Sequence, residues 1–277
     1  MKINIAKSSG FCFGVRRAIN TSLKLAHSKK KACILGDIVH NNFVVRELNQ
    51  AGLRKIKRIK PAPSNSALII SAHGAPILTF LRAKSAGYKI VDATCPKVKD
   101  IYKIARRLEK NSKIIIIGDL NHQEVKGIAG QLKKRAIVIE STKHLPLAQL
   151  KRIKKASVVT QSTQTLENIK AIMAELEKII PDITLYNTVC RTTLIKQEEI
   201  KCLPKANDLV LIVGSPTSAN TKRLYEISKA INKKTHWIET KKDLRPKWFK
   251  RIKTVGIMAG ASTPDVIVQE ITDALKN

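Results

Sequence analysis

Short apolar runs rich in Ile and Val alternate along the chain with longer segments in which apolar residues recur every three or four positions. The short runs are typical of strands, whereas the longer spacing places apolar side chains on one face of a helix. Their alternation predicts an α/β fold with largely parallel sheets. The predicted strands are 2–6, 32–35, 67–71, 89–92, 113–117, 136–139, 157–160, 183–187, 209–213, 235–238 and 254–258. The predicted helices include 15–27, 98–110, 166–180, 219–231 and 264–275.

Three of the five cysteines occupy equivalent places in this pattern. Cys12, Cys95 and Cys190 each follow a predicted strand and stand where the chain passes into a helix. Because each third of the chain supplies one of them, the element order predicts three similar α/β units around a shared centre. This prediction rests on the order of the elements alone, because the sequence shows no residue-level repeat.

Thiols at such junctions suit metal binding. A helix N-terminus directs unpaired N–H groups and the positive end of its dipole at the junction, which lowers the pKa of a cysteine and favours its thiolate. Three thiolates around four irons would leave one iron open to a substrate oxygen. The spacing leaves a second interpretation open, because isolated cysteines are common as small buried side chains and no C-x-x-C occurs. Cys33 and Cys202, away from any such junction, are assigned to this second class.

The chain is strongly basic, with 52 Lys and Arg against 21 Asp and Glu and a net charge of +31. Such a field attracts phosphates, acidic proteins or nucleic acids. An aromatic content of 4% is too low for the stacking platforms of single-strand binders, which argues against nucleic acid. The basic residues are spread over the chain, as on a solvated surface. Their main runs are 29–31, 54–60, 133–135, 151–155 and 241–242.

The N-terminal residues pass directly into a predicted strand and show no signal-peptide or transit-peptide pattern. No apolar run approaches the length of a membrane span. We therefore expect a soluble, cytoplasmic protein with no membrane partner. In that compartment cysteines are metal ligands, catalytic groups or core residues more often than disulfides.

The chain contains seven short motifs. They are GFCFGV at 10–15, VHN at 39–41, SAHG at 71–74, DATCP at 92–96, HQEV at 122–125, TQST at 160–163 and GASTPD at 260–265. In order and spacing, and over nearly the whole chain, they resemble the 4-hydroxy-3-methylbut-2-enyl diphosphate reductase family, the terminal reductases of the non-mevalonate isoprenoid pathway.

The resemblance implies three α/β domains in a pseudo-three-fold trefoil around a central [4Fe-4S] cluster. The expected bounds are 14–95 for the first domain, 96–187 for the second, and 188–277 with 1–13 for the third. It also implies reduction of (E)-4-hydroxy-3-methylbut-2-enyl diphosphate to isopentenyl and dimethylallyl diphosphates, with two electrons and two protons consumed and water released. Carried over by position, Cys12, Cys95 and Cys190 would bind the cluster, and the substrate hydroxyl would occupy the fourth iron.

By the same resemblance, Glu124 would supply the proton and Ser162 would orient the substrate alcohol. A carboxylic acid suits this task, because an alcohol leaves poorly unless its oxygen is protonated or bound to a metal. An exposed carboxylate at a helix start is the alternative for Glu124, and His122 two residues earlier favours the functional role.

A diphosphate needs several hydrogen-bond donors, and the resemblance assigns three histidines, two serines and an asparagine to it. Ser218 and Asn220 also open a predicted helix, where capping and phosphate binding are compatible. The other histidines, His27, His144 and His236, are interpreted as incidental. The assigned residues are His40, His73, His122, Ser218, Asn220 and Ser262.

The chain departs from the family pattern in three places. Ser162 replaces a Thr, so the orienting hydroxyl would sit on a freer side chain. Ala219 replaces a Ser, which removes one donor from the diphosphate site at a cost of roughly 0.5 to 1.5 kcal/mol. After Cys190, the segment 191–197 keeps only part of the family's Tyr-Ala-Thr and Asn-Arg-Gln pattern.

The basic surface also suits a small acidic electron donor, such as flavodoxin or ferredoxin. Three other functions remain open from sequence. A nucleic-acid-binding α/β protein has charge but no motif in its favour. A zinc deaminase would share the H-x-E pattern of His122 and Glu124, but the P-C-x-x-C that must follow is absent. A family member with impaired catalysis is compatible with the three departures.

Overall fold

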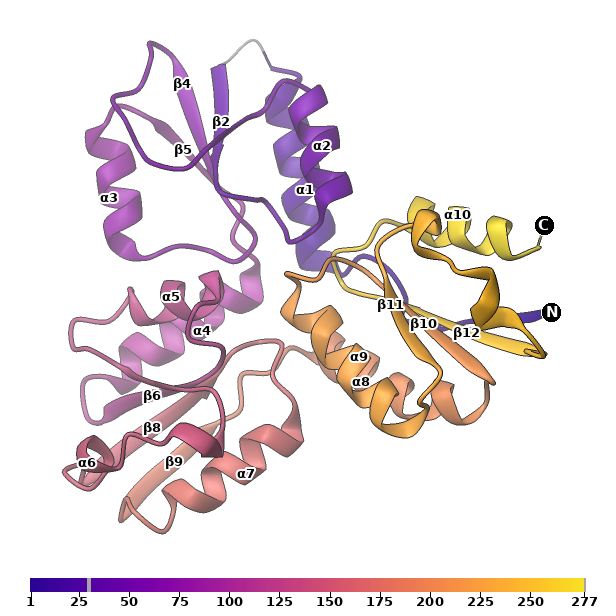
Figure 1. Cartoon of the computed structure of the whole chain (residues 1–277). Coiled ribbons are helices and arrows are strands. Elements are labelled where there is room, and N and C mark those ends of the chain that lie inside the picture. The colour runs from indigo at the N-terminus through magenta and orange to yellow at the C-terminus, as the bar shows by residue number, and fades with distance from the viewer. Residues whose placement is uncertain (29–30, 277) are drawn as a thin grey trace. The chain divides into compact units, whose positions relative to one another are not determined.

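The structure is a computed structural model that describes residues 1–28 and 31–276 (Figure 1). The first two residues of the predicted basic run 29–31 lie outside this description. The described strands form three four-stranded sheets in which every pairing is parallel. The chain folds as two compact units, one of residues 1–16, 39–46 and 191–277 and the other of residues 17–38 and 47–190.

The second unit holds two of the sheets, and the first of these has the strand order β3-β2-β4-β5. Its bounds are β2 (Lys31–Leu35), β3 (Arg54–Ile56), β4 (Ser66–Ile70) and β5 (Lys89–Asp92). The helix α3 (Ile77–Ser85) lies wholly in this unit, whereas α1 (Phe13–Ala26) and α2 (Asn42–Gln50) begin in the first unit and end in the second. One face of the sheet packs its buried Leu68 and Ile70 with Ala83 and Phe80 of α3. β4 is buried along its whole length, as expected for a central strand covered on both faces.

The other sheet of this unit has the order β7-β6-β8-β9. Its bounds are β6 (Lys113–Ile117), β7 (Ile137–Ile139), β8 (Lys155–Thr160) and β9 (Asp182–Tyr186). Its helices are α4 (Pro96–Leu108), α5 (Gln123–Ala129), α6 (Leu147–Leu150) and α7 (Leu166–Leu176). Successive isoleucines of β6 point to opposite faces, so Ile115 and Ile117 pack with α7 while Ile114 and Ile116 pack with α4 and α5.

The first unit contains the remaining sheet, in the order β1-β12-β10-β11. Its bounds are β1 (Lys2–Ile5), β10 (Leu209–Val213), β11 (Thr235–Ile238) and β12 (Thr254–Ala259). Its helices are α8 (Arg191–Cys202), α9 (Ala219–Ile231) and α10 (Asp265–Lys276). Leu211 and Ile257 pack with α10, whereas Ile212 and Met258 face α8 and α9. Short 3₁₀ helices lie at Thr142–His144, Leu203–Lys205, Lys241–Asp243 and Pro246–Phe249.

One strand order is common to the three sheets. In each sheet, the first and third strands of the segment are the two central strands. The second strand lies at the edge beside the first, and a fourth strand lies at the opposite edge beside the third. In the sheet of the first unit, β1 takes this fourth place by pairing with β12. The prediction of three similar α/β units with parallel sheets is therefore confirmed, and the bounds of the domains stay a prediction.

The predicted strands are confirmed to within two residues at either end. The helix predicted at 166–180 ends at Leu176, four residues early. β3, α2, α3 and α6 were not predicted, whereas for α5 and α8 only a helix start near Glu124 and after Cys190 was expected, without bounds. The extent of α8 could not be predicted because its buried residues include Thr193, Lys196 and Gln197. A helix that buries polar side chains has no apolar stripe to reveal it.

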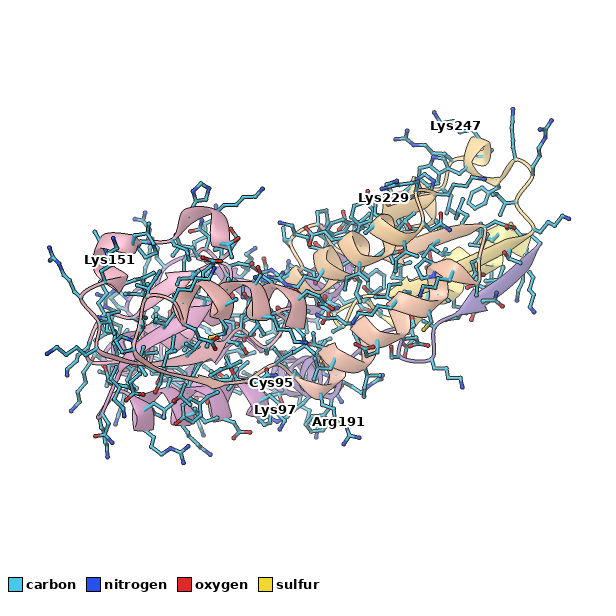
Figure 2. All side chains as sticks on the ribbon, turned by 90° about the horizontal axis from the view of Figure 1, so that it is seen from below. Cys95, Lys97, Lys151, Arg191, Lys229 and Lys247 are labelled. Carbon is cyan, nitrogen blue, oxygen red and sulfur yellow. The ribbon has the colours of Figure 1, made fainter. Side chains whose placement is uncertain are left out.

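Basic side chains extend outward along much of the ribbon, among them those of Lys151 and Lys247, which are both exposed (Figure 2). No helix in the described residues has both the length and the apolar character that a membrane span requires. The ion pairs between exposed groups, such as Lys178 with Glu175 at 2.7 Å, add little stability because water and salt screen them.

Tyr102 fixes α5 and the segment after β4 within the second unit. Its hydroxyl lies 3.4 Å from the carbonyl oxygen of His73. A Cβ at Gly127 of α5 would lie 2.3 Å from this hydroxyl oxygen, and a Cβ at Gly74 would lie 2.1 Å from it. Both positions therefore need glycine because the Tyr102 ring occupies the space.

We predict that Gly127→Ala destabilises the protein by about 1 to 3 kcal/mol, because the new methyl group collides with the Tyr102 hydroxyl. In a Tyr102→Phe background, the same change should become neutral or stabilising by up to about 1 kcal/mol, as expected for Gly to Ala within a helix. Urea unfolding of the two single variants and the double variant measures this coupling. Equal effects of Gly127→Ala in both backgrounds would contradict the packing described.

Candidate active site

Cys12 directly precedes α1 in the first unit and is half-buried. Its backbone N–H donates to the carbonyl oxygen of Ala261 at 3.1 Å, which joins it to the segment after β12. The sulfur accepts the backbone N–H of Val15 at 3.5 Å. An N–H directed at sulfur from the first turn of a helix stabilises a thiolate.

Cys95 and Cys190 belong to the second unit and are half-buried as well. Cys95 is the N-cap residue of α4, with Pro96 as its first helical residue, and its N–H donates to Ala72 at 2.9 Å. Cys190 directly precedes α8, and its N–H donates to the carbonyl oxygen of Ser162 at 2.9 Å. The predicted location of all three cysteines between a strand and a helix is thus confirmed, and their convergence on one centre stays a prediction.

The two remaining cysteines differ from each other. Cys33 is buried within β2, where burial raises the pKa of its thiol, so it is a small core residue as predicted. Cys202 is exposed at the end of α8, and its prediction as a buried side chain is wrong. That last turn of α8 buries Ile200 instead. None of the five cysteines, all of which the structure describes, forms a disulfide.

Glu124 and Ser162 form a buried pair that sequence could not establish. Glu124 is the second residue of α5 and is only 2% exposed. One of its carboxylate oxygens accepts the backbone N–H of Ser162 at 2.6 Å, and the other accepts the Ser162 hydroxyl at 2.8 Å. The alternative of an exposed carboxylate at a helix start is therefore wrong. A buried carboxyl group needs such donors, because burial without them is costly.

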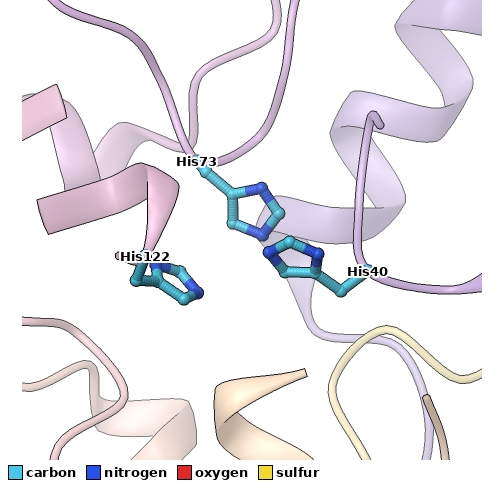
Figure 3. Close-up of side chains that lie close together, drawn as sticks. All are labelled: His40, His73 and His122. Carbon is cyan, nitrogen blue, oxygen red and sulfur yellow. The ribbon is translucent and has the colours of Figure 1, made fainter. Parts of the chain in front are cut away.

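His122 and His73 lie next to this pair. His122 is the N-cap residue of α5, and its Nδ1 accepts the backbone N–H of Glu124 at 3.1 Å. The rings of His73 and His122 meet edge to face, with centroids 5.4 Å apart (Figure 3). Because Nδ1 of His122 accepts a hydrogen bond, the proton of the neutral ring is on Nε2, which can donate to a ligand.

Tyr102 supports this group and was missed in the sequence, where an aromatic residue at helical spacing indicates only core. Burial, reinforced by the negative charges of Glu124 and Asp92, raises the pKa of Tyr102 above its ordinary value. The residue therefore stays a neutral phenol beside the carbonyl oxygen of His73. Tyr102 thus contacts the backbone of His73, whereas His122 is positioned as the N-cap residue of α5.

The first unit carries the remaining predicted residues at the ends of β10 and β12. Ser218 is the N-cap residue of α9 and accepts the backbone N–H of Thr221 at 3.3 Å. Asn220 is 5% exposed, and its amide nitrogen has no hydrogen-bond partner among the described residues. The Ser262 hydroxyl donates to the carbonyl oxygen of His40 at 3.0 Å. A buried donor without a partner indicates an absent acceptor.

Gly214 and Gly260 directly follow β10 and β12, and both pack against the side chain of Thr221. A Cβ at Gly260 would lie 2.1 Å from Oγ1 of Thr221, and one at Gly214 would lie 2.7 Å from the same atom. Gly214 also has a φ of +150°, which disfavours other residues. The first turn of α9 is thereby drawn close to the carboxyl ends of β10 and β12.

The chemistry available in each unit follows from these contacts. The second unit brings Glu124, Ser162, His73 and His122 together, which supplies a carboxyl group, a hydroxyl and two imidazoles. The first unit brings Ser262 together with the backbone of His40, and Ser218 and Asn220 share the first turn of α9. Helix N-termini with hydroxyl and amide donors are typical anion sites.

Comparison with known proteins gives the same family over the whole chain. The LytB protein family matches residues 3–276. The 4-hydroxy-3-methylbut-2-enyl diphosphate reductase of Pelobacter propionicus is 37% identical over 275 residues, which cover 98% of this chain and 96% of the relative. The reductase of the same name from Aquifex aeolicus is 34% identical over 279 residues, covering 99% of this chain and 96% of the relative.

Solved structures agree with these relatives. One is the (E)-4-hydroxy-3-methyl-but-2-enyl diphosphate reductase described as the terminal enzyme of the non-mevalonate pathway, with 34% identity, a TM-score of 0.73 and coverage of 100% of this chain and 99% of that one. Another is the E-1-hydroxy-2-methyl-but-2-enyl-4-diphosphate reductase from Plasmodium falciparum, with 28% identity, a TM-score of 0.90 and coverage of 100% and 88%. This chain therefore belongs to the LytB family, the family of the 4-hydroxy-3-methylbut-2-enyl diphosphate reductases.

Proposed function

We propose that this chain reduces (E)-4-hydroxy-3-methylbut-2-enyl diphosphate to isopentenyl and dimethylallyl diphosphates at a [4Fe-4S] cluster. Two electrons and two protons enter, the allylic C–O bond breaks, and the oxygen leaves as water. Full-length family membership supports the reaction. The observation that carries the active site is the buried Glu124 carboxyl group, bonded to Ser162 and flanked by His122.

The residues present fit an iron-sulfur cluster. Cys12, Cys95 and Cys190 are all reduced, half-buried and placed at the N-terminal end of a helix, where a thiolate is stabilised. Thiolates are the usual ligands of such clusters. When bound, the cluster supplies electrons and a Lewis-acidic iron for the substrate oxygen.

Glu124 holds the proton that the leaving hydroxyl needs. Its buried carboxyl group is oriented through both oxygens, by the N–H and the hydroxyl of Ser162. The Ser162 hydroxyl also reaches the substrate alcohol in this proposal, so it relays between alcohol and acid. Replacement of the family's Thr by Ser keeps this hydroxyl in contact with Glu124, which argues against impaired catalysis at this position.

In this proposal the diphosphate is bound by imidazole, hydroxyl and amide donors. His73 and His122 supply imidazole N–H groups, and His40 is assigned to the same anion by its position in the VHN motif. Ser218, Asn220 and Ser262 supply hydroxyl and amide donors at the ends of β10 and β12. The partnerless amide nitrogen of Asn220 supports this assignment, because an anion would satisfy it.

The electrons come from a small acidic carrier of the flavodoxin or ferredoxin class in this proposal, and the net charge of +31 supports it. A cytoplasmic location also stays a proposal, supported by five cysteines that form no disulfide.

Metal content tests the cluster. Anaerobically purified protein should contain about four iron and four sulfide per chain and absorb visible light. Replacing Cys12, Cys95 or Cys190 singly by Ser should remove most of this absorbance, whereas Cys202→Ser, the matched exposed control, should keep it. Full iron content in all three site variants would contradict the ligand assignment.

Glu124→Gln keeps the size of the side chain but removes the acid. We expect it to retain the chromophore and to lose at least about 100-fold in turnover with the diphosphate and a chemical reductant. Glu175→Gln, which changes a partly exposed residue of α7, is the matched control and should keep full turnover. Wild-type turnover in Glu124→Gln would remove Glu124 from the role of proton donor.

Salt dependence tests the acidic carrier. The rate of reduction by flavodoxin or ferredoxin should fall as ionic strength rises, because salt screens attraction between opposite charges. The rate with a small neutral reductant is the control and should change little. A carrier-driven rate that does not depend on salt would oppose the proposal.

A further inference from the structure

Lys196 is an unusual residue of α8 that the proposed chemistry does not use. It is 1% exposed and has the largest of the fully buried side chains among the described residues. Burying an ammonium group costs several kcal/mol unless its protons find acceptors. A lysine in such a place therefore needs a compensating set of contacts.

Those contacts are three backbone carbonyl groups. The Lys196 ammonium donates to the carbonyl oxygen of Ser8, to that of Gly10 at 3.1 Å and to that of Ala259 at 3.2 Å. An ammonium has three N–H donors and no acceptor, so three carbonyl oxygens satisfy it completely. Two of these oxygens belong to the loop between β1 and Cys12, and the third belongs to the end of β12.

Glu199, one turn further along α8, holds the same loop from its donor side. Its carboxylate accepts the backbone N–H of Lys7 at 2.5 Å, that of Ser8 at 2.8 Å and the hydroxyl of Ser8 at 2.5 Å. Although burial opposes it, the pKa of Glu199 is lowered by the hydrogen bonds from Ser8 and Lys7, so Glu199 is ionised at neutral pH. One helix thus provides a cation for the carbonyl groups of the loop and an anion for its N–H groups.

This loop leads directly to Cys12. Gly10 has a φ of +88°, and a Cβ there would lie 2.3 Å from the Asp265 carboxylate, so the loop has little room to move. Two residues later, the N–H of Cys12 bonds to Ala261. Burial lowers the pKa of Lys196 to about 8, against the attraction of Cys12, Glu199 and Asp265, and the ammonium remains the main form at pH 7.

We propose that Lys196 is a positioning residue for Cys12: its ammonium fixes the loop of residues 8–10 and places a buried positive charge beside the metal-binding sulfur. The loop contact stands on this structure alone, whereas the effect of the charge on a cluster rests on the proposed function. A positive charge near the cluster favours its reduced, more negative state.

Three variants and two readouts test the two effects of Lys196. Lys196→Met removes charge and donors, Lys196→Arg keeps both, and Lys201→Met is the matched control from a partly exposed ion pair on the same helix. In the metal-free protein, amide hydrogen exchange at residues 8–12 should be at least tenfold faster in Lys196→Met than in wild type. It should be within about twofold of wild type in the other two variants.

The reduction potential of the reconstituted cluster reports the charge, which a purely structural role would not change. At pH 7 we expect Lys196→Met to lower the equilibrium constant for one-electron reduction about tenfold, or about 59 mV, and Lys196→Arg to restore it. If Lys196→Met does not fold, Lys196→Gln, which keeps donors without the charge, replaces it.

Each outcome has a distinct meaning. Equal potentials in Lys196→Arg and the uncharged variant would overturn the role of the charge, and unchanged exchange at residues 8–12 would overturn the role of the loop contact. A wild-type chain that takes up no iron would instead refute the proposed function, and with it the effect on a cluster, while the exchange data still decide the loop contact.

Discussion

The helix N-terminus at the carboxyl end of a parallel strand is the constraint on which this structure depends. Cys12, Cys95, His122, Cys190 and Ser218 directly precede α1, α4, α5, α8 and α9. Parallel sheets place all such junctions of one sheet at a single edge, where unpaired N–H groups and helix dipoles favour negative charge. The proposed diphosphate substrate and the proposed thiolate-bound cluster are both anionic, so the same structural element suits both.

Much of the fold could be predicted from the hydrophobic pattern, because central parallel strands are buried on both faces and leave continuous Ile and Val runs. The same pattern could not give the extent of α8, whose buried face carries Thr193, Lys196 and Gln197. It also could not reveal β3, a three-residue edge strand that begins with Arg and Lys. Cys202 was misassigned because the sequence did not show how far the helix after Cys190 extends, and so could not distinguish an exposed cysteine at its end from a buried one.

The candidate site was predictable by residue type and motif but not by contact. The hydrogen bonds between Glu124 and Ser162 join positions 38 residues apart, and no periodicity encodes them. Tyr102 likewise resembles an ordinary core residue until the positions of Gly74 and Gly127 show how little space surrounds its hydroxyl. Long-range packing between α4, α5 and the segment after β4 sets these distances, and it emerges only in the folded chain.

The pairing of β1 with β12 has a consequence for the order in which this protein matures. Lys2 pairs with Thr254, and the loop before Cys12 forms hydrogen bonds with Lys196, Glu199 and Ala259. During synthesis these partners emerge from the ribosome long after Cys12. The loop before Cys12 can therefore form these contacts only when nearly the entire polypeptide has been synthesised. Contacts so distant in sequence also form slowly. The Cys12 ligand of the proposed cluster can therefore take its folded position only after nearly the whole chain has been synthesised.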